Sequence, residues 1–265
     1  MSGLVLSGIY RYPLKSARGA PLQAAQMDRF GLAGDRRWML VDESGRFQSQ
    51  RHLPAMALLE VSLLDGGLRL RYQGQDIAVE TPDPGGQRLI VRVWEDTVAA
   101  SLAATAVNDW LSERFAQPLR LVYYPDDAMR GVEPGYAPSS QLLNFADGFP
   151  LLIVSQESLD RLNERLPAPV PMDRFRPNLV ISGAQPHAED GWRSLRIGAA
   201  TISLLKPCSR CAVPSIDQHT AARDPLINRA LAQYRRRAGV IYFGMNAIAG
   251  AGASFSLGDT VEVLD

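Results

Sequence analysis

The sequence predicts a mainly β protein with peripheral helices, an α+β fold built from two linked β-rich domains. Three observations support this prediction. Short apolar or alternating segments recur along the chain, Gly- and Asp-containing turns separate many of them, and only three segments have helical periodicity. At 265 residues the chain is also long for one domain.

The N-terminal part has the rhythm of an antiparallel barrel or meander. Turn sequences at 65–67 and 73–74 separate three of its segments. Strands are predicted at residues 5–12, 26–30, 36–42, 47–50, 58–64, 68–72, 75–80 and 89–94.

The period changes after residue 100. Leu102, Ala106, Trp110 and Leu111 recur at helical spacing and predict a helix over 101–115. A strand is expected at 119–123, and the segment 125–140, rich in Pro, Gly and Asp, is expected to form a long exposed loop. The domain boundary is placed near Gln117, which divides the chain into residues 1–117 and 118–265.

The C-terminal part mixes strands with two helices. Ser155 is the predicted N-cap of a helix that runs to about residue 166. Pro225 is expected at the first position of a second helix that runs to residue 237, with Arg235, Arg236 and Arg237 beside the negative end of its dipole. Strands are predicted at residues 151–154, 192–197 and 201–205, and residues 176–181 lead into another strand. Residues 240–244 and 256–264 are predicted to hold strands and turns.

Composition excludes several classes of protein. Basic and acidic residues balance at 28 each, so nothing global indicates a nucleic-acid partner. The apolar runs are too short to span a bilayer, and the N-terminus is typical of a strand and not of a signal peptide. Two cysteines make no disulfide framework, which favours a cytoplasmic location, and they cannot hold an iron–sulfur cluster alone. Electrons for any redox reaction must come from outside the chain.

Both cysteines, Cys208 and Cys211, lie in the sequence KPCSRC. Four interpretations compete: a structural zinc site, a thioredoxin-like dithiol, inert buried cysteines, and a single thiolate ligand to a soft metal inside a cofactor. Lys206 and Arg210 weigh against purely apolar burial, because neighbouring cations favour a thiolate. A metal-bearing cofactor with a phosphate would also need cations and hydroxyls elsewhere.

Cations and hydroxyls of this kind occur in turns and at strand ends. Lys15, Ser16, Arg36 and Arg176 are the examples. Each alone is most simply explained by a surface salt bridge. Together they are what an anionic, phosphate-bearing ligand requires, because guanidinium and ammonium groups bind phosphate oxygens.

These residues lie in motifs that resemble the MOSC superfamily, in the branch of the mitochondrial amidoxime-reducing component and its bacterial relatives. The resemblance covers nearly the whole chain and implies an N-terminal β-barrel domain followed by a MOSC β-barrel domain. The matching stretches are IYRYPLKS at 9–16, GDRRWMLV at 34–41, residues 150–158, FRPNL at 175–179, CSRC at 208–211 and FGMN at 243–246.

The resemblance implies a molybdenum cofactor, Mo-molybdopterin, with Cys211 as the metal ligand and catalytic residue. The role of Cys208 stays open. Asn246 stands where the family's eukaryotic members have tyrosine. At the level of the family, the resemblance also includes pyridoxal phosphate binding. The residues implied to hold the pterin and its phosphate are Lys15, Ser16, Arg36, Asp147, Arg176, Asn178, Ser209, Arg210 and Asn246.

The implied reaction is the reduction of N-oxygenated small molecules: amidoximes, hydroxylamines and N-hydroxylated bases. Electrons would come from a separate ferredoxin-like or cytochrome b5-like protein. One alternative is a carrier or sulfurtransferase-type protein that binds molybdenum cofactor or sulfur without reductase turnover. Another is a dithiol protein without molybdenum.

Overall fold

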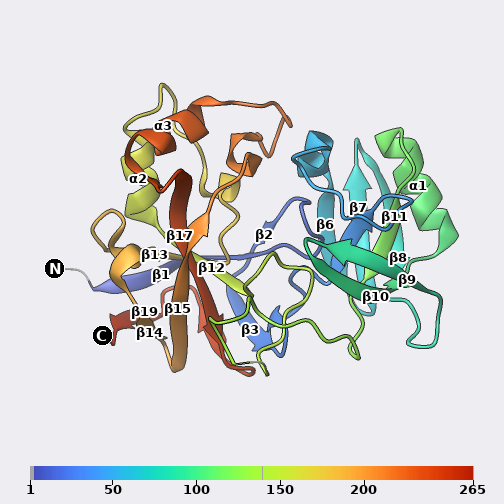
Figure 1. The fold of residues 1–265 in the computed structure, drawn as a ribbon, viewed down its shortest axis with the longest axis horizontal. Helices are drawn as coiled ribbons and strands as arrows, with labels where there is room; N and C mark the ends of the chain where they lie inside the picture. The colour runs from blue at the N-terminus through green and yellow to red at the C-terminus, as the bar shows by residue number, and fades with distance from the viewer. Residues whose placement is uncertain (1–2, 139, 265) are drawn as a thin grey trace.

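The computed structural model describes residues 3–138 and 140–264, and it has two lobes side by side (Figure 1). Met1, Ser2, Ser139 and Asp265 lie outside the described residues. The predicted loop 125–140 and the outer ends of the two predicted domains therefore include positions that the structure does not describe.

The C-terminal lobe is a closed β-barrel. Among the described residues, seven strands follow one another in the order β12-β13-β1-β19-β14-β15-β17, and a pairing between β12 and β17 closes the ring. All neighbours are antiparallel except β12 and β13. The bounds are β1 Leu4–Arg11, β12 Leu151–Ser155, β13 Leu179–Ser182, β14 Ser194–Ile197, β15 Ala200–Ser209, β17 Val240–Ala249 and β19 Thr260–Val263.

The apolar run of β12 is explained by burial on both faces. Leu151 and Ile153 point into the barrel core, whereas Leu152 and Val154 belong to a second apolar cluster outside it. Two helices cover that outer cluster, α2 (Gln156–Asn163) and α3 (Leu226–Tyr234), and both are seen beside the barrel in Figure 1.

Among the described residues, the N-terminal lobe holds two antiparallel sheets that enclose one apolar core, which includes Trp38, Leu68 and Leu111, and a second apolar cluster, which includes Val91, Val98 and Val122, lies on the other face of the larger sheet. Helix α1 (Thr105–Phe115) packs on this core through Val107, Leu111 and Phe115. The sheets are β5-β11-β10-β9 and β6-β7-β8, with bounds β5 Trp38–Val41, β6 Glu60–Leu64, β7 Gly67–Tyr72, β8 Gln75–Glu80, β9 Arg88–Val93, β10 Asp96–Leu102 and β11 Arg120–Tyr123.

The mainly β fold with peripheral helices is confirmed. The first strand, β1, belongs to the barrel of the C-terminal lobe, so the chain crosses between the lobes soon after it begins. The boundary near Gln117 stays a prediction. The remaining elements are β2 (Ala20–Pro21), β3 (Ala24–Asp28), β4 (Gly31–Leu32), β16 (Arg236–Arg237), β18 (Ser254–Ser256) and the 3-10 helices η1 (Pro54–Leu58), η2 (Met172–Arg174), η3 (Ala188–Gly191) and η4 (Val213–Ser215).

Several predicted elements need correction. Ser101 and Leu102 end strand β10 and do not begin the helix, because Val98 and Ala100 alternate with the residues between them and fill a sheet face. Residues 47–50 form no strand, and Phe47 makes only an isolated bridge to Val41. Strand β15 extends through Cys208, well beyond the predicted end at residue 205.

The second C-terminal helix is shorter than predicted. It ends at Tyr234, and Arg236 and Arg237 form a short strand paired with β17. Arg235 and Arg237 are held by Asp190, each at 2.7 Å. An ion pair, and not the helix dipole, therefore accounts for these two cations.

The strand that residues 176–181 are predicted to lead into is β13, which begins at Leu179. Arg176 has a backbone φ of 56° and therefore lies in a turn that leads into the strand.

Candidate functional site

Lys15 lies in the turn after β1, where its backbone N–H donates to the Trp38 carbonyl at 2.8 Å. Its buried ammonium group donates to the Phe145 carbonyl at 2.8 Å and to Asp147 Oδ1 at 2.5 Å. Burial lowers the pKa of Lys15, although Asp147 opposes the shift. Desolvation by the surrounding protein alone would raise the pKa of Asp147. The positive charge of Lys15 and the hydrogen bonds from Lys15 and the Trp94 indole N–H have the larger effect and lower this pKa.

The ring of Tyr12 contacts two guanidinium groups. Arg36 Cζ is 4.5 Å from the centre of its ring and Arg176 Cζ is 4.3 Å from it. The ring is fully buried, and its hydroxyl donates to the Pro177 carbonyl at 3.0 Å. Burial raises the pKa of Tyr12, so the ring stays neutral and offers its π face to both cations.

Arg36 is well neutralised. Its Nη1 donates to Asp35 Oδ2 at 2.5 Å and to Asn178 Oδ1 at 3.0 Å. Burial disfavours its charge, but Asp35 more than compensates and the pKa of Arg36 is raised. A backbone φ of 44° at Arg36 directs this side chain toward the neighbouring lobe. Arg36 is therefore a fixed cation at the junction of the lobes.

Arg176 is not neutralised in the same way. Nη1 donates to the Ala17 carbonyl at 2.6 Å, whereas the buried Nη2 has no partner among the described residues. Burial, followed by repulsion from Arg36, lowers the pKa of Arg176 to about 10. A half-buried cation with a buried, unused donor favours the approach of an anion.

Cations outnumber carboxylates in this network, as far as the described residues go. Lys15 pairs with Asp147 and Arg36 pairs with Asp35, whereas Arg176 forms no ion pair among the described residues and interacts with Asp173 only at longer range. The residues come from loops at the ends of β1, β12 and β13 and from the turn before β5. The donor set fits a phosphate-bearing group, because guanidinium and ammonium groups supply charge-assisted hydrogen bonds to phosphate oxygens.

The cysteine segment joins this network through Arg210. Its Nη1 donates to Cys208 Sγ at 3.2 Å, and its Nη2 donates to the Phe175 carbonyl at 2.7 Å. Both cysteines are free thiols; Cys208 is half-buried against the cluster beneath α3 and Cys211 is exposed. Cys211 Sγ accepts the Val213 backbone N–H at 3.5 Å. The more accessible sulfur is thus the second one.

The predicted site residues divide into two groups. The structure brings together Lys15, Arg36, Asp147, Arg176 and Asn178, and it attaches Arg210 through the backbone of Phe175.

Within the described ranges, three other predicted residues make no side-chain contact with that network. The Ser16 carbonyl accepts from Gln50 at 2.9 Å. Ser209 lies opposite Tyr242 in the sheet, and Asn246 lies opposite Lys206.

Sequence reasoning assigned no role to Tyr12 or Asp35. Both lie inside stretches that were singled out, Tyr12 three residues before Lys15 and Asp35 directly before Arg36. An acidic residue next to a predicted phosphate-binding arginine indicates an ion-pair partner for that arginine, so the sequence does contain a signal for Asp35. Tyr12 gave none, since an aromatic residue at the end of a strand is ordinary core material.

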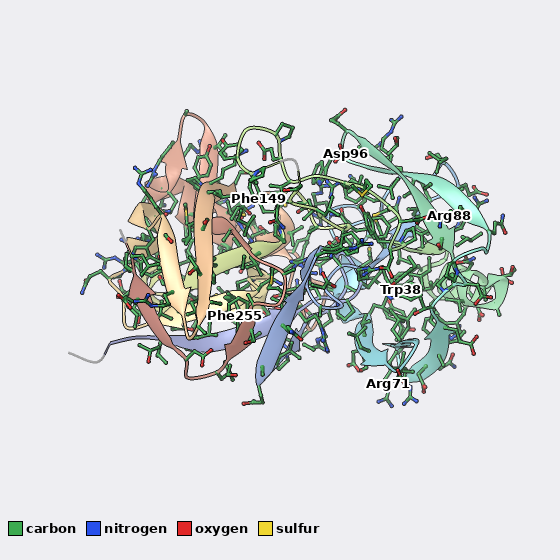
Figure 2. The ribbon with its side chains drawn as sticks, turned by 90° about the horizontal axis from the view of Figure 1, so that it is seen from below. Trp38, Arg71, Arg88, Asp96, Phe149 and Phe255 are labelled. Carbon is green, nitrogen blue, oxygen red and sulfur yellow. The ribbon has the colours of Figure 1, made fainter. Side chains whose placement is uncertain are left out.

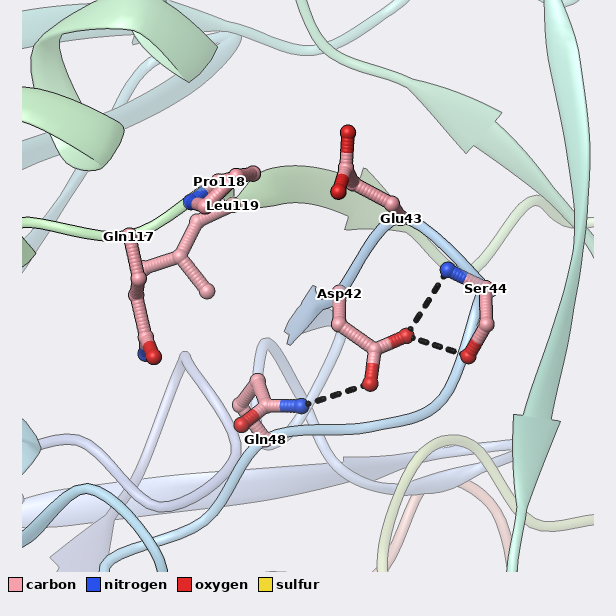
Figure 3. Close-up of a pocket in the computed structure, with 7 residues that line it drawn as sticks. All are labelled: Asp42, Glu43, Ser44, Gln48, Gln117, Pro118 and Leu119. Atoms are coloured by element: carbon pink, nitrogen blue, oxygen red, sulfur yellow. Dashed lines mark hydrogen bonds between the residues drawn. The ribbon is translucent and has the colours of Figure 1, made fainter.

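A pocket of about 390 Å³ lies apart from this network (Figure 3). The Asp42 carboxylate in its wall already accepts bonds from Ser44 and Gln48. Its lining contains none of the predicted site residues: it consists of Asp42, Glu43, Ser44, Gln48, Gln117, Pro118 and Leu119.

Residues 3–138 and 140–264 contain neither a preformed metal site nor a membrane-spanning helix. No group of three or more His, Cys, Asp or Glu side chains is arranged to hold a metal ion. None of the described helices combines the length and the apolar character that crossing a membrane requires.

Two family models match the chain. The MOSC N-terminal beta barrel domain matches residues 3–118, and the MOSC domain matches residues 141–262.

Curated relatives of two kinds are similar to the chain. Mitochondrial amidoxime-reducing component 1 from Homo sapiens is 30% identical over 244 residues, which cover 86% of this chain and 71% of that protein. The Xenopus laevis protein of the same name is 29% identical over 237 residues, covering 84% and 69%. Molybdenum cofactor sulfurase from Oryza sativa subsp. japonica is 32% identical over 279 residues, covering 92% of this chain but only 32% of the sulfurase. The chain thus spans about a third of the length of the sulfurases it matches.

Proposed function

The chain belongs to the MOSC family, and we propose that it is a molybdenum-cofactor-binding oxidoreductase that reduces N-oxygenated small molecules with electrons from a separate protein. Amidoximes, hydroxylamines and N-hydroxylated bases are the proposed substrates. The proposed electron donor is ferredoxin-like or cytochrome b5-like. The proposed location is the cytoplasm, and the proposed domains are residues 1–117 and 118–265.

One observation carries this proposal: the half-buried Arg176 guanidinium, which shares the Tyr12 ring with Arg36 and has a buried, unused Nη2 donor. Two like charges placed this close in a buried site destabilise the free protein, and an anion between or beside them relieves that repulsion. The phosphate of molybdopterin would be such an anion. The excess of cations in the network supports the same assignment.

The proposed holding residues follow from their positions. Lys15, Arg36 and Arg176 would bind the phosphate and Asn178 would orient Arg36, with which it shares a hydrogen bond of 3.0 Å. Asp147 would accept hydrogen bonds from the pterin ring, since its carboxylate is largely exposed beside Lys15. The network supports these roles. Ser16, Ser209 and Asn246 are assigned to the cofactor by the family resemblance alone.

Cys211 is the proposed metal ligand. A cysteine binds metal as a thiolate, which suits a soft coordination site, and the exposed sulfur is open to an incoming group. When bound, the cofactor supplies two-electron chemistry at an oxygen atom of the substrate, and the protein supplies binding and orientation. Arg210 orients the segment by bonding Cys208 on one side and Phe175 on the other.

The test is a turnover assay of cofactor-loaded protein with benzamidoxime and an artificial electron donor. We expect product amidine from the wild type and from Cys208→Ser, and none from Cys211→Ser. Loaded protein that never reduces benzamidoxime or a related N-hydroxy compound would contradict the reductase proposal. Activity lost in Cys208→Ser but kept in Cys211→Ser would show that the ligand is the other sulfur.

A second function, as a carrier or sulfurtransferase-type protein, is favoured by the similarity to molybdenum cofactor sulfurases over 92% of this chain. An exposed free cysteine also suits transient sulfur binding. In that case purified protein would bind the cofactor and pass it, or sulfur, to an acceptor enzyme, with no reduction of benzamidoxime.

A further inference from the structure

A pocket of about 350 Å³ on the N-terminal lobe has an unusual lining. Three of its residues are arginines, and two are aromatic. The lining consists of Arg46, Phe47, Arg51, His52, Arg92, Trp94 and Glu95. The proposed function uses none of these side chains as a cofactor or metal ligand.

The three guanidinium groups lack carboxylate partners. Arg46, Arg51 and Arg92 form no ion pair within the described ranges, even though Glu95 lies in the same wall. Asp42 accepts a hydrogen bond from the backbone N–H of Arg46 at 3.0 Å. With Glu95 in the wall and the Asp42 carboxylate near Arg46, three arginines meet two carboxylates, so the pocket keeps a net positive charge.

Trp94 is held in a strained position at the mouth of this pocket. It follows Val93 in the two-residue turn between β9 and β10, where Val93 pairs with Asp96. Its φ of 57° lies in a region that bulky residues rarely adopt, at a cost of about 1–3 kcal/mol. The two-residue hairpin loop requires a positive φ at this position, and Trp94 as a whole is 41% exposed.

Three contacts fix the indole plane. Its Nε1 donates to Asp147 Oδ1 at 3.1 Å, its ring lies 5.2 Å from that of Phe47, and Arg51 Cζ is 4.5 Å from its ring. The result is a preformed aromatic surface of two tilted rings, with the Arg51 guanidinium over the indole. Such a surface stacks with planar rings, while guanidinium forks bind oxyanions in pairs of hydrogen bonds.

We propose that this pocket binds a small ligand that combines a planar aromatic ring with a phosphate or carboxylate group. The ring stacks on Trp94, and the oxyanion is bound by Arg46 and Arg92, whose backbones lie side by side through an isolated bridge. The volume is within the usual range for pockets that hold small molecules.

The pocket adjoins the candidate cofactor site. Trp94 bonds Asp147, which in turn bonds Lys15, and Lys15 Nζ is 5.1 Å from the ring of Phe47. A ligand that moves the indole therefore changes the hydrogen bonding of Asp147. The two sites share a wall but use different cations.

The test is a titration of the purified full-length protein, followed by calorimetry, with uridine 5′-monophosphate and benzoate as probes. Uridine and inorganic phosphate are the matched controls that lack one of the two features. We expect at least one anionic aromatic probe to bind about tenfold more tightly than either control. The better of the two probes distinguishes a phosphate from a carboxylate ligand.

Three variants locate the binding. Arg92→Gln and Trp94→Gly should each weaken it about fivefold or more, since each removes one half of the recognition. Arg71→Gln is the control; this exposed arginine points outward from the lower edge of the same lobe (Figure 2), and its variant should change the affinity less than about twofold. Because Arg92 is exposed, Arg92→Gln keeps the test valid if Trp94→Gly does not fold.

Three results would overturn the proposal: no saturable binding of either probe, Arg92-dependent binding of inorganic phosphate as tight as that of the better probe, or loss of probe binding in Arg176→Gln. The last would place the anion at the candidate cofactor site. Absence of molybdenum from the protein would leave this proposal standing, so the two proposals fail separately.

Discussion

Arg174 and Arg176 are two residues apart and face opposite electrostatic surroundings, so replacing each by glutamine should have opposite effects on stability. Arg174 is buried and donates to Asp217 Oδ2 at 2.7 Å. Arg176 forms no ion pair among the described residues and shares the Tyr12 ring with Arg36. Both are compared in protein from a host that cannot make molybdenum cofactor.

The magnitude for Arg176 follows from its pKa of about 10. The folded state disfavours the charged form, so at pH 7 the side chain destabilises the fold by roughly 3 kcal/mol compared with an unperturbed arginine. Its stacking on Tyr12 and its bond to Ala17 offset about 2 kcal/mol of this. Arg176→Gln should therefore raise the free energy of unfolding by about 1 kcal/mol.

Arg174→Gln should lower the free energy of unfolding by about 2–4 kcal/mol, because Asp217 loses its partner at a mostly buried site. Urea denaturation at pH 7, followed by circular dichroism, measures both values. Inorganic phosphate should then stabilise the wild type more than Arg176→Gln. An Arg176→Gln protein less stable than the wild type by about 1 kcal/mol or more would refute the claim of an uncompensated cation.

Three further predictions concern single groups. Tyr12→Phe removes the hydrogen bond to the Pro177 carbonyl and should lower the free energy of unfolding by about 1–2 kcal/mol. The molybdenum content should stay unchanged because the ring remains, and a metal-free variant would contradict this. Ser155→Ala removes the N-cap of α2 and one hydrogen-bond donor to the buried Glu189. Urea denaturation should show that the free energy of unfolding falls by about 2–3 kcal/mol. A decrease below about 0.5 kcal/mol would count against the cap. Burial lowers the pKa of His187 to about 4, so between about pH 6.5 and 4 only the unfolded state binds the proton, and stability should fall as the pH decreases through that range. Thermal unfolding of His187→Gln should show a weaker decline in stability over the same range. An unchanged decline would contradict the assignment.

Local patterns predicted many elements because their signals are local. The hairpin of β7 and β8 follows from the turn at Gln73 and Gly74, and Ser155 caps α2 as its side chain predicts. Periodicity failed at Ser101, where apolar residues at helical spacing continue backward into strand β10. Alternation in β12 was hidden because the strand is buried on both faces.

Long-range pairing was beyond the reach of sequence patterns. Nothing local indicates that β1 completes the barrel of the C-terminal lobe or that β12 and β17 close it, because register depends on partners far along the chain. The candidate site shows the same division. Lys15, Arg36 and Arg176 were grouped by their chemistry, whereas Tyr12, whose ring contacts both arginines, became visible only in three dimensions.

The molybdenum and pterin content of protein purified from cofactor-competent cells tests the central claim most directly. We expect the wild type and Cys208→Ser to contain molybdenum and pterin in equal amounts, and Cys211→Ser to lose most of its molybdenum. Wild-type protein that contains neither molybdenum nor pterin would contradict the proposed cofactor and, with it, both the reductase and the cofactor-carrier functions.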